Sequence, residues 1–245
     1  RDALVEKIDI GGPAMLRAAA KNHDFLTVLC DPTDYPEFTQ LLQQHGGTNF
    51  AMREQLAAKT FARTAAYDSA ISGWMANHLD HTLPEMTSLA GSKTESLRYG
   101  ENPHQQAALY KTNTHRPGVT TARQLQGKPL SYNNINDTDA AFELVAEFEA
   151  PTIAIIKHAN PCGVASAIDL RTAWDMAFAA DPVSAFGGIV AMNRPLDTAT
   201  ANAVSDLFTE VVIAPDASEE AIMIMSAKPN LRLLLTGDMP DRSDA

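Results

Sequence analysis

The sequence predicts an α/β fold in which short buried strands alternate with helices. In the second part of the chain, apolar runs with the length of buried strands are separated by segments of helical periodicity. In chain order these segments are helix 137–149, strand 152–157, helix 168–180, strand 188–192, helix 198–208, strand 211–214, helix 218–227 and strand 231–235. This alternation is typical of a layered architecture built on a largely parallel sheet.

The first part of the chain predicts helices around one strand. Pro13 suits the first turn of a helix, where its missing N–H is harmless, and residues 14–21 are strong helix formers. Residues 25–30 form an apolar run with the length of a buried strand. A helix is predicted over residues 34–44, and apolar side chains at helical spacing predict a longer one over residues 51–79.

A change of composition marks a domain boundary. Residues 80–96 are rich in His, Thr, Pro, Gly, Ser and Lys, which is typical of a linker. We therefore divide the chain into residues 1–80, a linker at 81–96 and residues 97–245. The chain begins without Met, in what reads as the middle of an α/β unit, and it closes on a polar tail. These ends lead us to expect a part of a longer protein.

Composition and charge exclude several classes of function. Hydrophobic residues make up 45% and charged residues 20% of the chain, as in a soluble globular protein. No apolar run approaches the roughly 18 residues of a membrane helix, so no membrane partner is expected. The formal net charge of −11 argues against a nucleic-acid surface. Cys30 and Cys162 are far apart and lack Cys or His partners at ligand spacing, which predicts no disulfides, no zinc and a reducing cytoplasm.

Lys157 and His158 end the predicted strand 152–157, and ligands of open α/β sheets gather outside the carboxyl ends of strands. A histidine can take a proton near neutral pH, and a partly desolvated lysine can assist it. The two residues are therefore a candidate proton-transfer pair. The alternative from these residues alone is a solvated lysine beside a structural histidine.

Cys162, four residues after His158, is a rival candidate as a nucleophile. It would need a neighbour that stabilises its thiolate, and no cysteine-protease signature surrounds it. A small, partly buried structural cysteine is the favoured interpretation.

Further polar segments fit a nucleotide ligand. Arg98, followed by Tyr99, has a planar guanidinium that can grip phosphate oxygens. Residues 127–137 are rich in asparagine, whose amide suits a carboxamide or ring edge, although a turn with an N-cap at Asp137 is the favoured interpretation. Residues 184–188 place an aromatic ring beside two glycines, which could admit a flat ring or form a tight turn.

The first predicted helix offers a second candidate site. Residues 8–12 lead into a helix N-terminus, which can bind an anion through its free N–H groups. Arg17 and Lys21 stand at i and i+4 and project from one face of that helix. Lys21 could also act as an acid or base, whereas surface cations in salt bridges are the commoner case.

Taken together, the motifs of this chain resemble those of the bifunctional purine-biosynthesis family, which joins an IMP cyclohydrolase to an AICAR formyltransferase. The resemblance covers essentially the whole chain. The motifs that carry it are Ile8-Asp9-Ile10-Gly11-Gly12 with residues 17–23, Leu97-Arg98-Tyr99-Gly100 with residues 102–105, residues 157–163 with the sequence Lys-His-Ala-Asn-Pro-Cys-Gly, and Ser184-Ala185-Phe186-Gly187-Gly188.

The resemblance implies two incomplete domains. Residues 1–80 look like the last part of a methylglyoxal-synthase-like cyclohydrolase domain with linking helices. Residues 97–245 look like the first part of a cytidine-deaminase-like formyltransferase domain that uses no zinc. The upstream Lys-Thr-Leu-His-Pro motif and the later folate-binding half are missing from this sequence. We therefore predict little or no activity of the 245-residue chain by itself in either reaction.

The resemblance also implies roles for individual residues. His158 matches the base that takes a proton from the AICAR 5-amino group, Lys157 the residue that stabilises the transition state, and Lys21 the catalytic lysine of ring closure. The positions that match nucleotide-binding residues are Arg98, Tyr99, Asn134, Phe186, Gly187 and Glu210 for AICAR, and Asp9, Ile10 and Gly11 in the cyclohydrolase part.

The implied co-substrate is 10-formyltetrahydrofolate, and the implied assembly is a homodimer whose formyltransferase sites borrow residues from the partner subunit. Two other classes of function remain open. One is a nucleotide-binding module without catalysis. The other is a thiol enzyme that uses Cys162.

Overall fold

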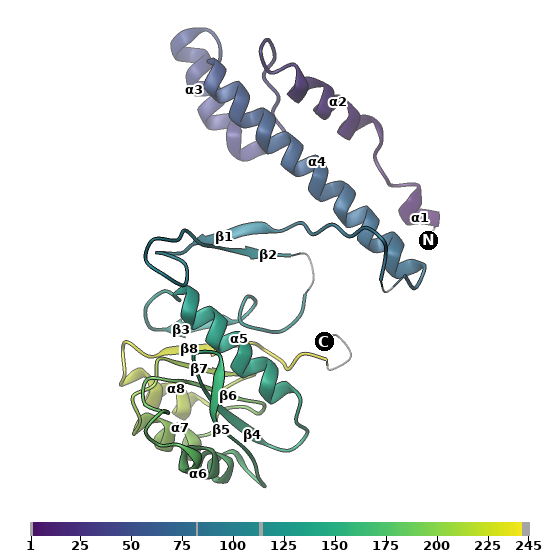
Figure 1. The fold of residues 1–245 in the computed structure, drawn as a ribbon. Helices are drawn as coiled ribbons and strands as arrows, with labels where there is room; N and C mark the ends of the chain where they lie inside the picture. The colour runs from purple at the N-terminus through teal and green to yellow at the C-terminus, as the bar shows by residue number, and fades with distance from the viewer. Residues whose placement is uncertain (1, 82, 113–114, 242–245) are drawn as a thin grey trace. The chain divides into compact units, whose positions relative to one another are not determined.

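The structure is a computed structural model, and it describes residues 2–81, 83–112 and 115–241. The chain folds as two compact units, Arg1–Ser92 and Lys93–Ala245. Figure 1 shows the first unit in purple to blue and the second in teal to yellow. Within the described residues, no helix is both long enough and apolar enough to cross a membrane.

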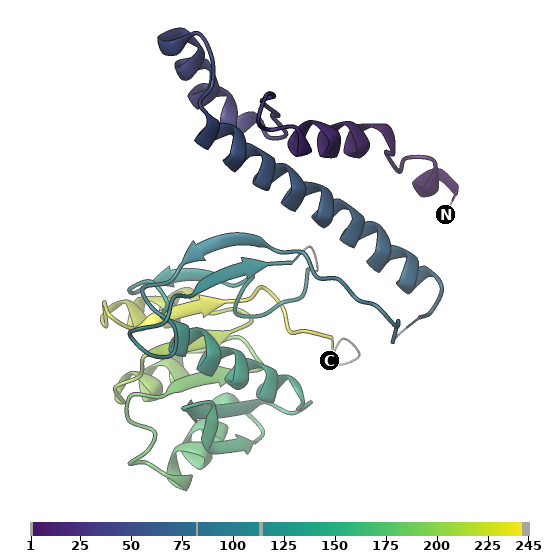
Figure 2. The ribbon, with the colours of Figure 1, turned by 45° about the horizontal axis from the view of Figure 1, so that its top comes forward.

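The first unit is helical. Its elements are α1 (Asp2–Val5), α2 (Gly11–Lys21), the 3-10 helix η1 (Pro32–Asp34), α3 (Tyr35–His45) and α4 (Phe50–His78). The three longer helices of this unit confirm the sequence prediction to within a few residues. The N-cap of α4, the long blue helix of Figure 2, is Asn49, whose side chain accepts a hydrogen bond from the Met52 N–H at 2.8 Å. α3 ends at His45, and Gly46, with a φ of 70°, adopts the left-handed conformation of a C-terminal cap.

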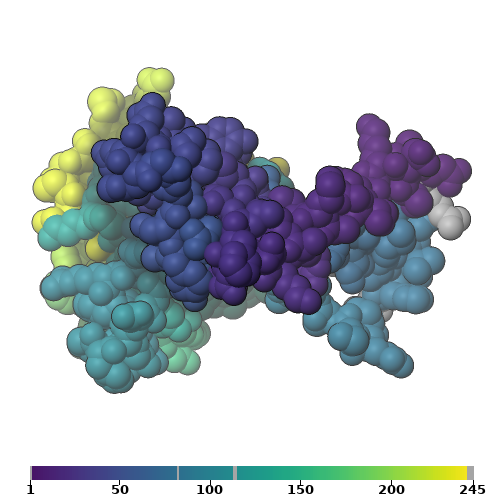
Figure 3. Space-filling model, turned by 90° about the horizontal axis from the view of Figure 1, so that it is seen from above, coloured from purple at the N-terminus to yellow at the C-terminus, as the bar shows by residue number. Residues whose placement is uncertain are grey.

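The core of this unit is small and joins α2 to α4. Ala20 and Ala57, from these two helices, pack with Val28. Figure 3 shows the purple atoms of α2 beside the blue atoms of the later helices. The predicted strand at residues 25–30 is wrong: residues 2–81 and 83–91 contain no strand. Without a neighbouring strand to pair with, this run stays irregular, and Phe25 is 87% exposed.

The second unit alternates strands and helices, as predicted. Its elements are β1 (Ser92–Ser96), β2 (Ala108–Lys111), β3 (Arg123–Gln126), α5 (Tyr132–Ala146), β4 (Thr152–Lys157), β5 (Asn160–Ser166), α6 (Leu170–Ala180), β6 (Ile189–Met192), α7 (Thr198–Ser205), β7 (Val211–Ala214), α8 (Glu219–Ser226) and β8 (Arg232–Leu235). The four predicted strands are β4, β6, β7 and β8, and each lies within one residue of its predicted bounds.

The main sheet is mixed, so the prediction of a largely parallel sheet is wrong. Its six strands have the order β3-β8-β7-β6-β4-β5. Only the pairs β6–β7 and β7–β8 are parallel, whereas β3–β8, β4–β5 and β4–β6 are antiparallel. The reason is local: β4 turns back directly into β5, and such a short connection can join only antiparallel strands.

Helices cover both faces of this sheet (Figure 1). On one face, Phe142 and Val145 of α5 pack against Ala154 and Ile156 of β4. The other face packs against apolar side chains of α6, α7 and α8, among them Trp174. The predicted layered α/β architecture is thereby confirmed for this unit.

Other differences from the prediction have physical causes. β1, inside the predicted linker, is fully exposed, so its polar sequence gives no burial signal. β5 contains Pro161 and Gly163, which are typical of turns. α5 begins five residues before residue 137, because Ser131 and Asn134 form a capping box. Asp137 therefore lies inside α5, and its predicted role as the N-cap is wrong.

Candidate functional site

The candidate site lies where the ends of several strands of the main sheet meet. We call this line of strand ends the sheet edge. β3 and β4 end at this edge, whereas β6, β7 and β8 begin there, because β4 is antiparallel to β6 and β3 to β8. In the register, Ile156 of β4 pairs with Ile189 of β6. Val211 of β7 pairs with both Ile189 and Arg232 of β8. Residues next to these strand ends are therefore neighbours in space although they are far apart in sequence.

The sequence analysis expects ligands to gather at the carboxyl ends of strands, and this holds for only part of the site. Lys157 is the last residue of β4, and His158 follows it. Gly187 and Glu210, by contrast, precede the amino ends of β6 and β7. The mixed sheet brings both kinds of strand end to the same edge.

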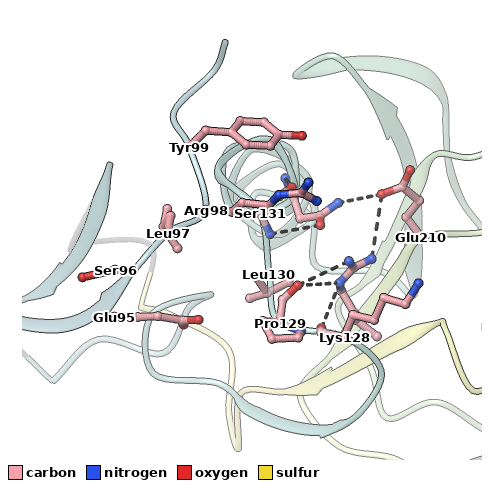
Figure 4. A pocket seen from close by; sticks show the side chains of 12 residues that line it. Glu95, Ser96, Leu97, Arg98, Tyr99, Lys128, Pro129, Leu130, Ser131 and Glu210 are labelled. Atoms are coloured by element: carbon pink, nitrogen blue, oxygen red, sulfur yellow. Dashed lines mark hydrogen bonds and ion pairs between the residues drawn. The ribbon is translucent and has the colours of Figure 1, made fainter. Parts of the chain in front are cut away.

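A pocket of about 610 Å³ opens at this edge, and Figure 4 shows it from close by. Four of the predicted AICAR-binding residues line it together. Its lining residues are Glu95, Ser96, Leu97, Arg98, Tyr99, Lys128, Pro129, Leu130, Ser131, Asn134, Glu210 and Arg232. The lining includes three cations, Arg98, Lys128 and Arg232, and two carboxylates, Glu95 and Glu210. Such cations can bind a phosphate group.

Glu210 is held at the pocket wall by two other lining residues. The Asn134 side-chain amide donates a hydrogen bond to Glu210 Oε2 at 2.8 Å. The guanidinium of Arg232 lies 3.9 Å from the same oxygen, and its side chain is only 13% exposed. Figure 4 shows dashed lines reaching the Glu210 carboxylate from both partners. A carboxylate fixed in this way can accept hydrogen bonds from a ligand without first reorganising.

Arg232 also ties the loop before α5 to the sheet. Its Nε donates to the carbonyl oxygens of Lys128 at 3.1 Å and Pro129 at 3.3 Å. The approach is close at Gly127, where a Cβ atom would lie 2.6 Å from the Leu231 carbonyl oxygen. A glycine at this position, with a φ of 91°, is what lets the loop reach β8.

Asn134 is buried, and the start of α5 fixes its side-chain amide. The Ser131 Oγ accepts a hydrogen bond from the Asn134 N–H at 3.1 Å, and Asn134 Oδ1 accepts one from the Ser131 N–H at 3.2 Å. With the oxygen used in this capping box, the NH₂ group points to Glu210. The asparagine-rich segment thus supplies both a helix cap and a pocket residue.

Arg98 and Tyr99 line the pocket from the segment that follows β1, and Figure 4 shows Arg98 beside Ser131. The Arg98 guanidinium sits over the Tyr99 ring, 5.7 Å from its centroid. Backbone hydrogen bonds from Leu97 to Ala107 and from Gly100 to Gln105, both 3.0 Å long, fix the segment on either side. The two side chains therefore come from a braced segment rather than from a free loop end.

Four further predicted residues form a second group beside the β4–β5 turn. The Lys157 ammonium donates a hydrogen bond to the Phe186 carbonyl oxygen at 2.9 Å. The Gly187 N–H donates to the Phe208 carbonyl oxygen at 2.7 Å, and the Phe186 and Phe208 rings lie 5.1 Å apart. Phe186 is 59% exposed and His158 is exposed, so an aromatic face and an imidazole are both accessible.

The two groups are adjacent but separate. Lys157, His158, Phe186 and Gly187 do not line the pocket of about 610 Å³. They connect to it through the Glu210 N–H, which donates to the Gly188 carbonyl oxygen at 3.0 Å. The arrangement places the pocket and the turn that carries His158 along the same sheet edge.

Sequence reasoning missed three residues of this edge: Lys128, Arg232 and Asp137. The sequence predicts Arg232 as part of an apolar strand, although a charged residue at the start of a buried strand can itself indicate a functional role. Lys128 lies in the segment 127–137, for which only the asparagines suggest a ligand. The sequence predicts Asp137 as a helix cap, yet its carboxylate accepts hydrogen bonds from the N–H groups of His158 and Ala159.

The rival nucleophile Cys162 faces away from α5. Its side chain packs with the cluster formed under α6, α7 and α8. Burial raises the pKa of the Cys162 thiol, and the Asp181 carboxylate raises that pKa further. A thiol held in its protonated form is a poor nucleophile, so the structure argues against the thiol-enzyme hypothesis.

In the first unit, the predicted residues lie at the two ends of α2. Asp9 Oδ1 accepts a hydrogen bond from the Gly12 N–H at 2.9 Å, so this carboxylate occupies the helix N-terminus. Ile10 is 75% exposed and Gly11 is exposed. Lys21 ends the same helix about 15 Å from Gly11, given a rise of about 1.5 Å per residue. α2 therefore keeps Lys21 apart from Asp9, Ile10 and Gly11.

No three His, Cys, Asp or Glu side chains lie close enough to hold a metal ion among the residues that the structure describes.

Residues 19–245 match the model of a protein family described as the AICARFT/IMPCHase bienzyme. The chain is 58% identical over 247 residues to the bifunctional purine biosynthesis protein PurH of Parvibaculum lavamentivorans, a match that covers 100% of this chain and 46% of that protein. It is 60% identical over 241 residues to PurH of Rhizobium leguminosarum bv. trifolii and 59% identical over 240 residues to PurH of Caulobacter vibrioides, with 97% of this chain and 45% of each relative covered. The chain thus spans just under half the length of these curated relatives.

Proposed function

The chain belongs to the AICARFT/IMPCHase bienzyme family, and we propose that the whole protein carries out the last two steps of IMP synthesis. In the first step, the formyl group of 10-formyltetrahydrofolate passes to the 5-amino group of AICAR. In the second, the product closes its ring to form IMP with loss of water. Because the chain spans less than half of its relatives, it contributes a part of each site.

For the formyl transfer, we assign His158 as the base. The amino nitrogen of AICAR attacks the formyl carbon and loses a proton to the imidazole. The carbon–nitrogen bond to the folate then breaks, and the folate nitrogen takes up a proton. An amine conjugated to a carboxamide is a weak nucleophile, so a neutral imidazole that accepts its proton helps directly.

Lys157 supplies positive charge for this step. The formyl oxygen becomes an oxyanion in the tetrahedral intermediate, and an ammonium group can stabilise it. The hydrogen bond from Lys157 to the Phe186 carbonyl oxygen supports this role, because it keeps the ammonium on the base-bearing side of the edge.

The nucleotide occupies the pocket and the aromatic face beside it. The positive charge of Arg98, Lys128 and Arg232 suits the phosphate, while Asn134 and Glu210 offer polar groups to the sugar or base. Phe186 and Gly187 present a flat surface to the imidazole ring of AICAR. The single observation that carries the proposal is that four predicted formyltransferase residues line one pocket and the other four lie in a group connected to it through the Glu210 N–H.

For the ring closure, we propose that Lys21 is catalytic and that Asp9, Ile10 and Gly11 bind the nucleotide. The two ends of α2 would then contribute to the site separately, and other parts of the whole protein would complete it. Ring closure within one molecule mainly needs orientation and proton shuttling, which such scattered groups can provide together.

The finer domain assignment is part of this proposal. We propose that the first unit is the end of a methylglyoxal-synthase-like domain and the second unit the start of a cytidine-deaminase-like domain without zinc. On the family resemblance alone, we also propose that the whole protein is a cytoplasmic homodimer.

The experiment that tests the base is His158→Ala in the whole protein. Formyl transfer should fall by about 10²–10⁴-fold, as loss of general base catalysis typically causes. Cyclisation of supplied formyl-AICAR should continue, because Lys21 lies in the other unit. The matched control is His45→Ala at the exposed end of α3, which should leave both rates unchanged. Formyl transfer that survives His158→Ala would rule out this residue as the base.

For the 245-residue chain by itself, the pocket favours nucleotide binding without turnover. All twelve lining residues of the pocket belong to the second unit. Calorimetry should detect AICAR binding to the chain, and an assay with 10-formyltetrahydrofolate should detect little or no formyl transfer. Turnover at an ordinary enzymatic rate would contradict the assignment of only a partial site to this chain.

A further inference from the structure

The turn that carries His158 has a conformation that its own residues do not favour. Lys157 pairs with Asn160 in the β4–β5 hairpin, so His158 and Ala159 form a two-residue turn. Their φ angles are 55° and 56°. A type I′ turn requires positive φ at both central residues, and Asn-Gly or Gly-Gly is the usual sequence there. Neither His nor Ala adopts the left-handed region readily, because the Cβ atom crowds the backbone.

Two side chains hold this turn. Within the hairpin, the Asn160 side-chain amide donates a hydrogen bond to the His158 carbonyl oxygen at 2.7 Å. From outside the hairpin, Asp137 of α5 binds both turn residues. Asp137 Oδ1 accepts a hydrogen bond from the Ala159 N–H at 2.9 Å. Asp137 Oδ2 accepts one from the His158 N–H at 3.3 Å. One carboxylate thus binds the backbone of both left-handed residues. Hydrogen bonds to an ionised acceptor are stronger than those between neutral groups, so this contact can stabilise an otherwise costly conformation.

The position of Asp137 on α5 links the turn to the nucleotide pocket. Asp137 follows Asn134 by three residues, so the two side chains project from the same side of the helix. Asn134 donates to Glu210 in the pocket wall, while Asp137 accepts from the turn. The capping box of Ser131 and Asn134 fixes the start of this helix. The first turns of α5 therefore hold both halves of the site at once.

We propose that Asp137 is a positioning residue for His158. By binding the N–H groups of residues 158 and 159, its carboxylate holds the turn in the left-handed conformation that aims the imidazole at the amino group of the bound nucleotide. This inference rests on the proposed function of His158 as the base. Asp137 itself neither touches the substrate nor exchanges a proton with it.

The test compares Asp137→Ala with the double variant Asp137→Ala/Ala159→Gly in the whole protein. Asp137→Ala should lower kcat for formyl transfer by about 10²-fold, the size of effect expected from a misplaced catalytic group, with little change in KM for AICAR. Ala159→Gly lets one of the two residues adopt positive φ freely, so the double variant should recover at least about 10-fold of the lost rate. Cyclisation should be unchanged in both variants.

A matched control separates positioning from stability. Asp197 also binds the backbone through its carboxylate: at the N-cap of α7 it accepts a hydrogen bond from the Thr200 N–H at 2.7 Å, and it follows the far end of β6. Asp197→Ala should lower the melting temperature without lowering kcat. Asp137→Asn, which keeps one acceptor oxygen and the same shape, should fall between the unsubstituted enzyme and Asp137→Ala.

Amide hydrogen exchange of residues 158 and 159 gives a readout that does not depend on activity. Both amides should exchange faster in Asp137→Ala than in the unsubstituted chain. An unchanged kcat in Asp137→Ala, or a rate that Ala159→Gly fails to raise, would overturn the proposal. If instead His158→Ala keeps full activity, the proposed function of His158 fails, whatever the exchange rates show.

Discussion

The two units of this chain place their predicted site residues in opposite ways. In the second unit, residues that lie as far apart in sequence as Arg98 and Glu210 line one pocket. In the first unit, Gly11 and Lys21 are only ten positions apart, yet they occupy opposite ends of α2. A sheet edge gathers residues from several strands, whereas a single helix keeps residues apart along its axis.

The two units also differ in the extent of their hydrophobic cores. Two clusters of buried apolar side chains fill the second unit, one on each face of the main sheet. The core cluster of the first unit consists of Ala20, Val28 and Ala57. Apolar side chains such as Met15 and Phe25 are 71% and 87% exposed there. The second unit can therefore hold its site residues by its own packing, whereas the first unit buries few apolar side chains.

The largest expected effect is on stability, and it differs between two Gly→Ala substitutions, one in each unit. At Gly163 in β5, a Cβ atom would lie 2.0 Å from the carbonyl oxygen of Ala177, so Gly163→Ala forces β5 away from α6. It should destabilise the second unit by about 3 kcal/mol, the range of an overpacked core. At Gly73 in α4, a Cβ atom meets nothing within 4 Å. Gly73→Ala should stabilise that helix by about 1 kcal/mol.

Urea denaturation of the two variants measures this contrast. The transition should move to lower urea for Gly163→Ala and to the same or higher urea for Gly73→Ala. Equal destabilisation by both substitutions would contradict the difference in packing between the units.

A smaller effect is expected at the pocket from Arg232→Met. The substitution removes the guanidinium that holds the Lys128 and Pro129 carbonyl oxygens and neighbours Glu210. AICAR should bind this variant about 10-fold more weakly, or about 1.4 kcal/mol. Arg171→Met is the control, because Arg171 pairs with Asp175 on the exposed surface of α6, and Arg171 does not line the pocket. Calorimetry that finds the same loss for both arginines would show that general charge, not the pocket, binds the nucleotide.

The smallest expected effect is a loss of stability of the first unit at acidic pH. Hydrogen bonds from Thr33, and then from Lys59, lower the pKa of Asp31 from 3.8 to about 2. A lowered folded-state pKa adds stability above the unfolded value, and that stability is lost as the pH falls from about 4 through about 2. Asp31→Asn should remove this part of the pH dependence.

Amide exchange of α4 peptides, measured by mass spectrometry between pH 2 and 5, tests this prediction. Lys59 belongs to α4, so loss of its partner should be felt in this helix. Identical pH dependence in Asp31→Asn and in the unsubstituted chain would exclude Asp31 as the source.

The fold was predictable where burial was complete. β4, β6, β7 and β8 are apolar throughout or nearly so, and their sequences predict them within a residue. β5 could not be predicted from Pro161 and Gly163, because its pairing depends on a turn stabilised from outside. The run at residues 25–30 is as apolar as a strand, but strand formation needs a partner that the first unit does not offer within its described residues.

The candidate site was predictable only in part, because some of its residues depend on contacts between segments that are distant in sequence. Lys157 and His158 stand out because they end a buried strand. Asp137 acts through the backbone of residues 158 and 159, and this contact depends on the packing of α5 against β4. Arg232 joins the site through its register with Val211. Such roles arise from three-dimensional neighbours and leave no pattern in the local sequence.

The central claim is that the nucleotide site of this chain lies at the sheet edge of the second unit. NMR titration of the isotope-labelled chain with AICAR tests it most directly. We expect shifts of the amides of residues 97–99, 128–134, 210 and 232, and of the turn at 157–160, with α2 unaffected. Shifts confined to α2, or none at the sheet edge at saturating AICAR, would contradict the account.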